Sequence, residues 1–106
     1  MDHGSPVKGL VARTGDGAVA GICHYVLHLN TWCVTPVCYL EDLFTDPAHR
    51  GRGVGRALID HLVALGRERG WNRVYWQTHQ DNATARRLYD GVAGGNDGFV
   101  RYVIRL

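Results

Sequence analysis

The stretch that decides the fold is residues 46–56, which read Asp-Pro-Ala-His-Arg-Gly-Arg-Gly-Val-Gly-Arg. After it, apolar residues recur every three or four positions, at Val54, Leu58, Leu62 and Leu65, which predicts an amphipathic helix over residues 51–69. Before it, residues 31–44 have the composition of a strand. The stretch therefore joins a strand to a helix through a turn in which three glycines alternate with larger residues.

The charges of this turn indicate a ligand. The first backbone N–H groups of a helix lack partners within the helix and bind anions, and glycines allow an anion to approach closely. The helix dipole disfavours cations there by about 0.3–1 kcal/mol each. The turn nevertheless carries Arg50, Arg52 and Arg56, and from Arg50 onward the first acidic residue is Asp60. The sequence therefore predicts a phosphate site, the alternative being a solvated basic surface beside a glycine-rich turn.

Outside the turn, the periodicities predict strands over residues 9–13, 18–29, 73–78 and 99–106, in addition to 31–44. A second helix is predicted from a cap at Asn82 to about residue 92, and Gly70 is expected to end the first helix. The order is β-β-β-α-β-α-β. Strands separated by a helix pair in parallel, so the fold class is α+β (mixed α/β) in two or three layers.

Length and composition predict one packed domain. The chain has 106 residues, 45% of them hydrophobic, and a net charge of +2. We expect residues 1–6 to be a flexible N-terminus or tag remnant and residues 7–106 to form the domain. The small net charge argues against nucleic acid and membrane partners, and the chain has no apolar run of about 20 residues. Three cysteines without a secretory signal favour a cytoplasmic location.

A metal site is not expected. Cys23, His28, Cys33 and Cys38 recur every five residues, which places successive members on opposite faces of a strand. No Cys-x-x-Cys pair is present, so the spacing does not resemble that of a zinc site.

Three linked motifs resemble the GCN5-related N-acetyltransferase family. Residues 50–55, Arg-Gly-Arg-Gly-Val-Gly, match its Gln/Arg-x-x-Gly-x-Gly/Ala signature. Residues 39–45, Tyr-Leu-Glu-Asp-Leu-Phe-Thr, resemble the strand before that signature, and residues 82–89 resemble the family's second motif-bearing helix. The motifs look closest to those of diamine and histone/polyamine acetyltransferases. The strand and two helices that usually open the family's fold have no counterpart in the first nine residues.

The resemblance implies acetyl-CoA as the acetyl donor. Its pyrophosphate would lie on the turn, its pantetheine arm would pair with the preceding strand, and a bulge there would open the slot. A backbone N–H near Phe44 would hold the acetyl oxygen. The implied cofactor-binding residues are Leu43, Phe44, Thr45, Arg50, Gly51, Arg52, Gly53, Val54, Gly55, Arg56 and Asn82.

The resemblance also implies two catalytic residues. Tyr89 matches the tyrosine that protonates the departing thiolate, and its alternative is a core aromatic residue. Glu41 matches a position often used as the base, and its alternative is a surface carboxylate. Strict strand alternation would point Glu41 and Asp42 to opposite faces.

The predicted function is transfer of an acetyl group from acetyl-CoA to a primary amine, either a small amine or polyamine or a protein lysine, by direct attack in a ternary complex. One alternative is a CoA-binding module without turnover, and another is a domain that binds phosphate or nucleic acid. A sheet face without its usual helices would expose apolar surface, so we expect a homodimer.

Overall fold

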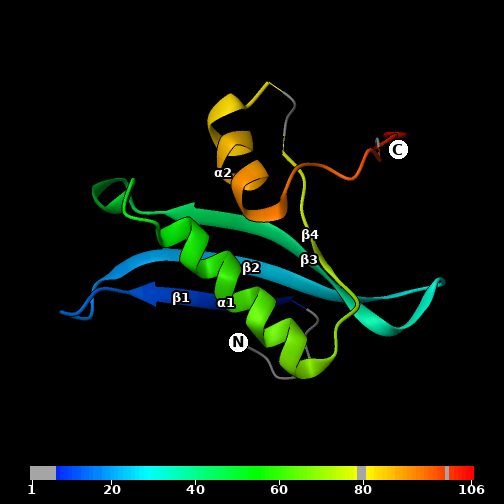
Figure 1. Cartoon of the computed structure of the whole chain (residues 1–106), viewed down its shortest axis with the longest axis horizontal. Helices are drawn as coiled ribbons and strands as arrows, with labels where there is room; N and C mark the ends of the chain where they lie inside the picture. The colour runs from blue at the N-terminus through cyan, green and yellow to red at the C-terminus, as the bar shows by residue number, and fades with distance from the viewer. Residues whose placement is uncertain (1–6, 79–80, 100) are drawn as a thin grey trace.

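The computed structural model describes residues 7–78, 81–99 and 101–106 (Figure 1), so the expected flexible end at residues 1–6 lies outside the described residues. Its strands are β1 (Val7–Arg13), β2 (Val19–Asn30), β3 (Cys33–Thr45) and β4 (Val74–Tyr75). Its α-helices are α1 (Val54–Arg69) and α2 (Ala83–Ala93), and a short 3₁₀ turn spans Pro47–His49. Both predicted helices and the first three predicted strands are confirmed.

The four strands form one sheet in the order β1-β2-β3-β4. The first three are an antiparallel meander, whereas β4 runs parallel to β3, with Cys38 opposite Val74 and Tyr39 opposite Tyr75. The parallel pairing follows from the crossover through α1 and confirms the mixed sheet. The fold class is therefore α+β, as predicted.

Helix α1 packs across one face of the sheet (Figure 1); one glycine allows its close approach to the sheet, and a second allows Trp71 to pack against the helix. A Cβ on Gly21 of β2 would lie 2.7 Å from Val54 Cγ1 and 2.9 Å from the Phe44 carbonyl oxygen. A Cβ on Gly66 of α1 would lie 2.9 Å from the Trp71 ring. The core between helix and sheet consists of Cys23, Tyr25, Cys38, Leu40, Leu58, Ile59 and Leu62.

Helix α2 lies on the same side of the sheet as α1. Tyr89 of α2 packs edge-on against Trp76, with ring centroids 5.5 Å apart, and both residues contact the core beneath α1. Within the described ranges, no helix covers the opposite face, where Val11 is 51% and Phe44 53% exposed. The described molecule therefore has two layers. Neither of its α-helices is both long and apolar enough to span a membrane.

Two predicted strands require correction. The strand expected over residues 73–78 is paired only at Val74–Tyr75. The strand expected over residues 99–106 is wrong for the described residues 99 and 101–106, which have no regular structure and extend away from the sheet (Figure 1). Alternating apolar residues predict a strand only where a neighbour supplies hydrogen bonds. Here the exposed Phe99, Tyr102 and Ile104 have no such neighbour among the described strands.

Candidate active site

The turn before α1 has a backbone conformation that favours glycine at two positions. Gly51 and Gly53 have φ values of 80° and 77°, in the left-handed region that favours glycine. Helix α1 begins at Val54 without a side-chain cap and without an acidic residue in its first turn. The first N–H groups of the helix therefore face outward with no carboxylate of that turn beside them.

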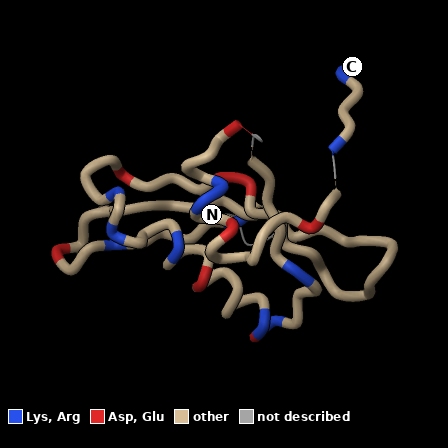
Figure 2. Tube along the Cα trace, turned by 45° about the horizontal axis from the view of Figure 1, so that its top comes forward, with Lys and Arg blue, Asp and Glu red and all other residues tan. Residues whose placement is uncertain are grey.

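Three arginines surround this helix start. The Arg56 Nε atom lies 3.8 Å from Asp60 Oδ2 one turn along the helix, and both side chains are more than half exposed. A pair of this kind contributes little to stability. Arg50 and Arg52 are exposed beside the glycines. Over the rest of the trace, acidic and basic residues are interspersed (Figure 2), so this turn differs in combining several arginines with a helix N-terminus.

Next to this turn, the end of β3 has no β4 partner among the described residues, and this unpaired edge of β3 is called the slot. Their pairing ends at Tyr39 and Tyr75, whereas β3 continues to Thr45. Between these points β3 carries a bulge: Leu40 pairs with Tyr25 and Asp42 with His24, which leaves Glu41 as the extra residue. The bulge in β3 that the family resemblance implies is therefore present, and whether the unpaired edge beyond it receives a pantetheine arm stays a prediction.

The slot and the turn are contiguous. A Cβ on Gly55 would lie 3.7 Å from Leu43 Cδ2, 3.8 Å from Thr45 Oγ1 and 3.6 Å from Leu88 Cδ2. The helix start therefore contacts the end of β3 and one face of α2 at the same point. The structure brings together turn, strand and second helix, which are the three elements that carry the predicted cofactor-binding residues.

Two predicted residues lie on α2. Asn82 is its N-cap, and its Oδ1 accepts a hydrogen bond from the Ala85 backbone N–H at 3.1 Å, which leaves the Nδ2 group as the donor that the cap does not use. Tyr89 is partly buried against Trp76, and desolvation raises the pKa of its phenol. Tyr89 therefore carries its proton at neutral pH and has the protonation state that a proton donor needs.

The bulge alters the predicted arrangement of the two carboxylates. Strict alternation fails at Glu41, and Asp42 lies across from His24 on the sheet face that α1 leaves open. The His24 Nδ1 atom lies 3.4 Å from Asp42 Oδ2, with the two side chains 42% and 64% exposed. Sequence reasoning missed His24, because the pairing of residues 24 and 42 depends on the extra residue in β3.

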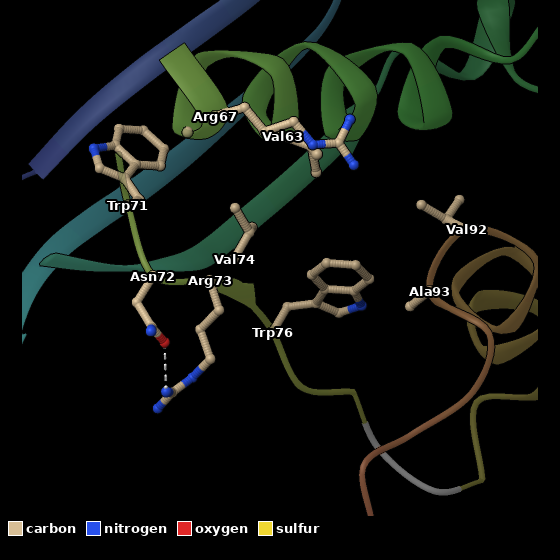
Figure 3. Close-up of a pocket in the computed structure, with 10 residues that line it drawn as sticks. Val63, Arg67, Trp71, Asn72, Arg73, Val74, Trp76, Val92 and Ala93 are labelled. Atoms are coloured by element: carbon tan, nitrogen blue, oxygen red, sulfur yellow. Dashed lines mark hydrogen bonds between the residues drawn. The ribbon is translucent and has the colours of Figure 1, made fainter. Parts of the chain in front are cut away.

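A cavity of about 300 Å³ lies elsewhere, between the C-terminal half of α1, β4 and the end of α2 (Figure 3). Trp71, Val74 and Trp76 line it on one side and Val63 and Val92 on others. None of the predicted site residues lines this cavity. Its walls are mostly apolar, and it lies toward the C-terminal end of α1, whereas the glycine turn lies at the N-terminal end.

The two buried cysteines, Cys23 and Cys38, are not activated as nucleophiles. Burial raises the pKa of the Cys23 thiol and raises that of Cys38 to about 12, so both stay protonated at neutral pH. Across residues 7–78, 81–99 and 101–106, no three His, Cys, Asp or Glu side chains form a group that could hold a metal ion.

The class that this fold and site define is an α+β domain with a glycine- and arginine-rich turn that leads from the unpaired end of a strand into a helix. The sequence model of the acetyltransferase (GNAT) family matches residues 2–93. The chain is 39% identical over 88 residues to the D-amino-acid N-acetyltransferase of Saccharomyces cerevisiae, covering 83% of this chain and 55% of the relative. It is 34% identical over 86 residues to the thialysine N-epsilon-acetyltransferase of Caenorhabditis elegans, covering 81% and 52%.

A solved acetyltransferase structure has the same fold. The ribosomal-protein-alanine N-acetyltransferase of Brucella melitensis biovar Abortus superposes with a TM-score of 0.84 at 26% identity, covering 98% of this chain and 74% of that one. The protein belongs to the acetyltransferase (GNAT) family. The chain spans about half the length, or less, of the first curated relatives that it matches.

Proposed function

We propose that this chain is the donor-binding part of an N-acetyltransferase that uses acetyl-CoA and a primary amine. The observation that carries the proposal is the contact of the Gly55 helix start with Leu43 and Thr45 of the splayed strand. One continuous surface thus offers outward N–H groups for a diphosphate and an unpaired strand edge for an extended, amide-containing arm.

The donor would be held by three parts of this surface. The N–H groups of residues 51–56 and the guanidinium groups of Arg50 and Arg52 bind the pyrophosphate. The backbone of residues 43–45 pairs with the pantetheine arm, because β4 ends before it reaches them. Asn82 donates its Nδ2–H to the same arm while its oxygen caps α2.

The reaction needs a neutral amine, a stabilised oxyanion and a protonated leaving thiolate. Acetyl-CoA supplies a thioester whose carbonyl carbon is open to attack by an amine. A backbone N–H near Phe44 stabilises the oxyanion. Tyr89, which desolvation keeps protonated, donates its proton to the thiolate sulfur. Glu41 is exposed at the bulge and is one candidate for the group that removes a proton from the amine.

The proposed acceptor is a small primary amine or a protein lysine. The relatives named above act, by name, on D-amino acids and on thialysine, and both acceptors carry primary amines. The open sheet face exposes Asp42 and Glu41 beside the slot, and these carboxylates would attract a cationic amine.

The test combines binding with turnover. Thermal-shift and calorimetric titrations with acetyl-CoA measure the donor site, and thiol release against a panel of amines measures transfer. Tyr89→Phe should bind acetyl-CoA normally and lower turnover by about 10²–10⁴-fold, whereas Tyr102→Phe, at a tyrosine that is 92% exposed, should match the wild type. Binding without product from any amine would favour a CoA-binding module instead.

We also propose that a second copy of the chain packs against part of the uncovered sheet face and forms one wall of the acceptor site, so that the slot stays accessible. Val7, Val11 and Phe44 expose apolar surface on that face. Analytical ultracentrifugation across a hundredfold concentration range should show a dimer, and a single monomeric species throughout would contradict this.

A further inference from the structure

We propose that His24, placed beside Asp42 at the β3 bulge, is the base that removes a proton from the ammonium group of the acceptor. This inference rests on the proposed N-acetyltransferase function and identifies a residue for it that the family motifs do not mark. The observation that carries it is the 3.4 Å distance between His24 Nδ1 and Asp42 Oδ2 on the open sheet face.

The position of the pair matches the side from which an acceptor can arrive. Helices α1 and α2 occupy one side of the sheet, so within the described chain the slot between β3 and β4 is open toward the other side. Asp42 immediately precedes residues 43–45, where the donor arm is proposed to lie. His24 pairs with Asp42 across the strands and faces the same open side.

Few charged groups face His24 from the elements packed around it. On β1, the residue opposite is Gly9, flanked on that face by Val7 and Val11. On β3, the facing acid is Asp42, with Glu41 next to it in the bulge. On β2 itself, the next ionisable side chain on this face is His28, four residues along. Asp42 is therefore the carboxylate that lies directly across from His24 on this face.

The arrangement assigns a role to each imidazole nitrogen. The Asp42 carboxylate only accepts hydrogen bonds, so the neutral tautomer that suits it carries its proton on Nδ1. The Nε2 atom then has a lone pair that can accept a proton.

An imidazole suits this proton better than a carboxylate does. An alkylammonium group has a reference pKa of ~10.4, an imidazole ~6.5 and a glutamate carboxylate ~4.3. The equilibrium constant for proton transfer from the ammonium group is therefore about 10⁻⁴ when the acceptor is an imidazole and about 10⁻⁶ when it is a carboxylate. The difference, about 10²-fold, favours a histidine as the base.

The proton balance of the step is complete. One N–H proton of the ammonium passes to His24 Nε2 and from there to solvent. The neutral amine nitrogen then forms the C–N bond with the thioester carbonyl carbon. When the C–S bond breaks, the thiolate takes the Tyr89 proton. The second N–H proton leaves the nitrogen and, through solvent, restores the Tyr89 phenol.

His28 provides a matched control. It lies on the same strand and the same face, but both of its nitrogens are engaged: Nδ1 donates to the Leu29 carbonyl at 3.0 Å, and Nε2 accepts from the Tyr75 hydroxyl at 2.8 Å. This bonded imidazole has no lone pair for an incoming ammonium group. The two histidines therefore share a strand and a sheet face, and they differ in whether a ring nitrogen can accept a proton from the amine.

The experiment is a kcat/KM profile from pH 6 to 10.5 for wild type, His24→Gln, His28→Gln and Glu41→Gln, with one accepted amine. At pH 7 His24→Gln should be at least about 10²-fold slower than the wild type. The defect should disappear as the pH passes the pKa of the amine, because a neutral amine needs no base. His28→Gln should follow the wild-type profile, and calorimetry should give His24→Gln the wild-type affinity for acetyl-CoA.

Several results would overturn the assignment. A His24→Gln profile equal to wild type, or lowered by one factor at every pH, would exclude His24 as the base. Loss of the pH-dependent component in Glu41→Gln alone would move the role to Glu41. A wild type that turns over no amine would reject the proposed function itself, which separates that failure from the failure of His24.

Discussion

The arginines at the two ends of α1 interact with the helix dipole in opposite ways. At the C-terminal end, Arg67 and Arg69 lie in the last turn, and Gly70 closes the helix through its N–H bond to the Gly66 carbonyl. Cations there interact favourably with the helix dipole. At the N-terminal end the charges have the same sign, which the dipole disfavours, and neither an acidic residue nor a side-chain cap is present in the first turn.

The comparison shows which end is arranged for stability and which for a ligand. Gly53 and Gly70 have nearly the same φ, 77° and 75°, and an added Cβ would meet nothing within 4 Å at either. The backbone conformation at these two glycines is therefore nearly the same, and the two ends differ in whether the helix dipole favours or disfavours the arginines beside them. An anion at the N-terminal end would remove the conflict between the arginines and the dipole.

The largest expected effect comes from reversing the arginine charges. We expect the Arg50→Glu/Arg52→Glu variant to weaken acetyl-CoA binding by roughly 10²-fold or more, because two charged hydrogen bonds, each contributing about 1.5–3 kcal/mol, are lost. The same variant should unfold at a slightly higher denaturant concentration, because acids suit a helix N-terminus. Calorimetry and urea unfolding measure the two effects.

The matched control is Arg67→Glu/Arg69→Glu at the other end of the helix. It should keep wild-type affinity and lose stability by about 0.3–1 kcal/mol per site. Equal losses of affinity in the two double variants would show that the cofactor responds only to net charge.

The next largest expected effect is a loss of folding stability when a side chain is added at the glycines packed near the two ends of α1. Gly21→Ala should destabilise the fold by about 1–3 kcal/mol, because its Cβ would meet Val54 and the Phe44 backbone oxygen. Gly66→Ala should cost less, because its Cβ would meet the ring of one side chain, Trp71, rather than backbone. Free energies of unfolding from urea titrations test this ranking, which a larger loss in Gly66→Ala would reverse.

Substitutions at the two glycines with positive φ, Gly53 and Gly70, can distinguish the effect of backbone strain on stability from an effect on acetyl-CoA binding. Gly53→Ala and Gly70→Ala should each lose about 1–2 kcal/mol of stability, because alanine is strained at positive φ. We expect acetyl-CoA affinity to fall in Gly53→Ala alone, since that Cβ lies where the anion approaches. If both variants bind the donor as the wild type does, the close approach at Gly53 is not required.

The smallest expected effect concerns the Arg56–Asp60 pair. Asp60→Asn should free Arg56 for the anion and raise affinity about twofold, with a stability change of no more than about 0.5 kcal/mol. Glu68→Gln, near the C-terminal end of α1, should leave affinity unchanged. A lower affinity in Asp60→Asn would mean that Asp60 positions Arg56 for the ligand.

Local signals made the elements near α1 predictable. The 3-4 spacing of Leu58 and Leu62, the Gly70 stop and the Asn82 cap are properties of neighbouring residues, and each holds in the structure. The strand expected over residues 99–106 failed because pairing depends on a partner far along the chain. The pairing of His24 with Asp42 could not be predicted either, because it depends on the one extra residue in β3.

The most direct test of the central claim compares CoA with pantetheine, which lacks the phosphates, by calorimetry on the wild type and on Arg50→Glu/Arg52→Glu. The account predicts that the wild type binds CoA much more tightly than pantetheine and that the double variant loses most of this preference. Equal affinity of the wild type for both ligands, or no heat with CoA at millimolar concentration, would contradict a diphosphate site at the start of α1.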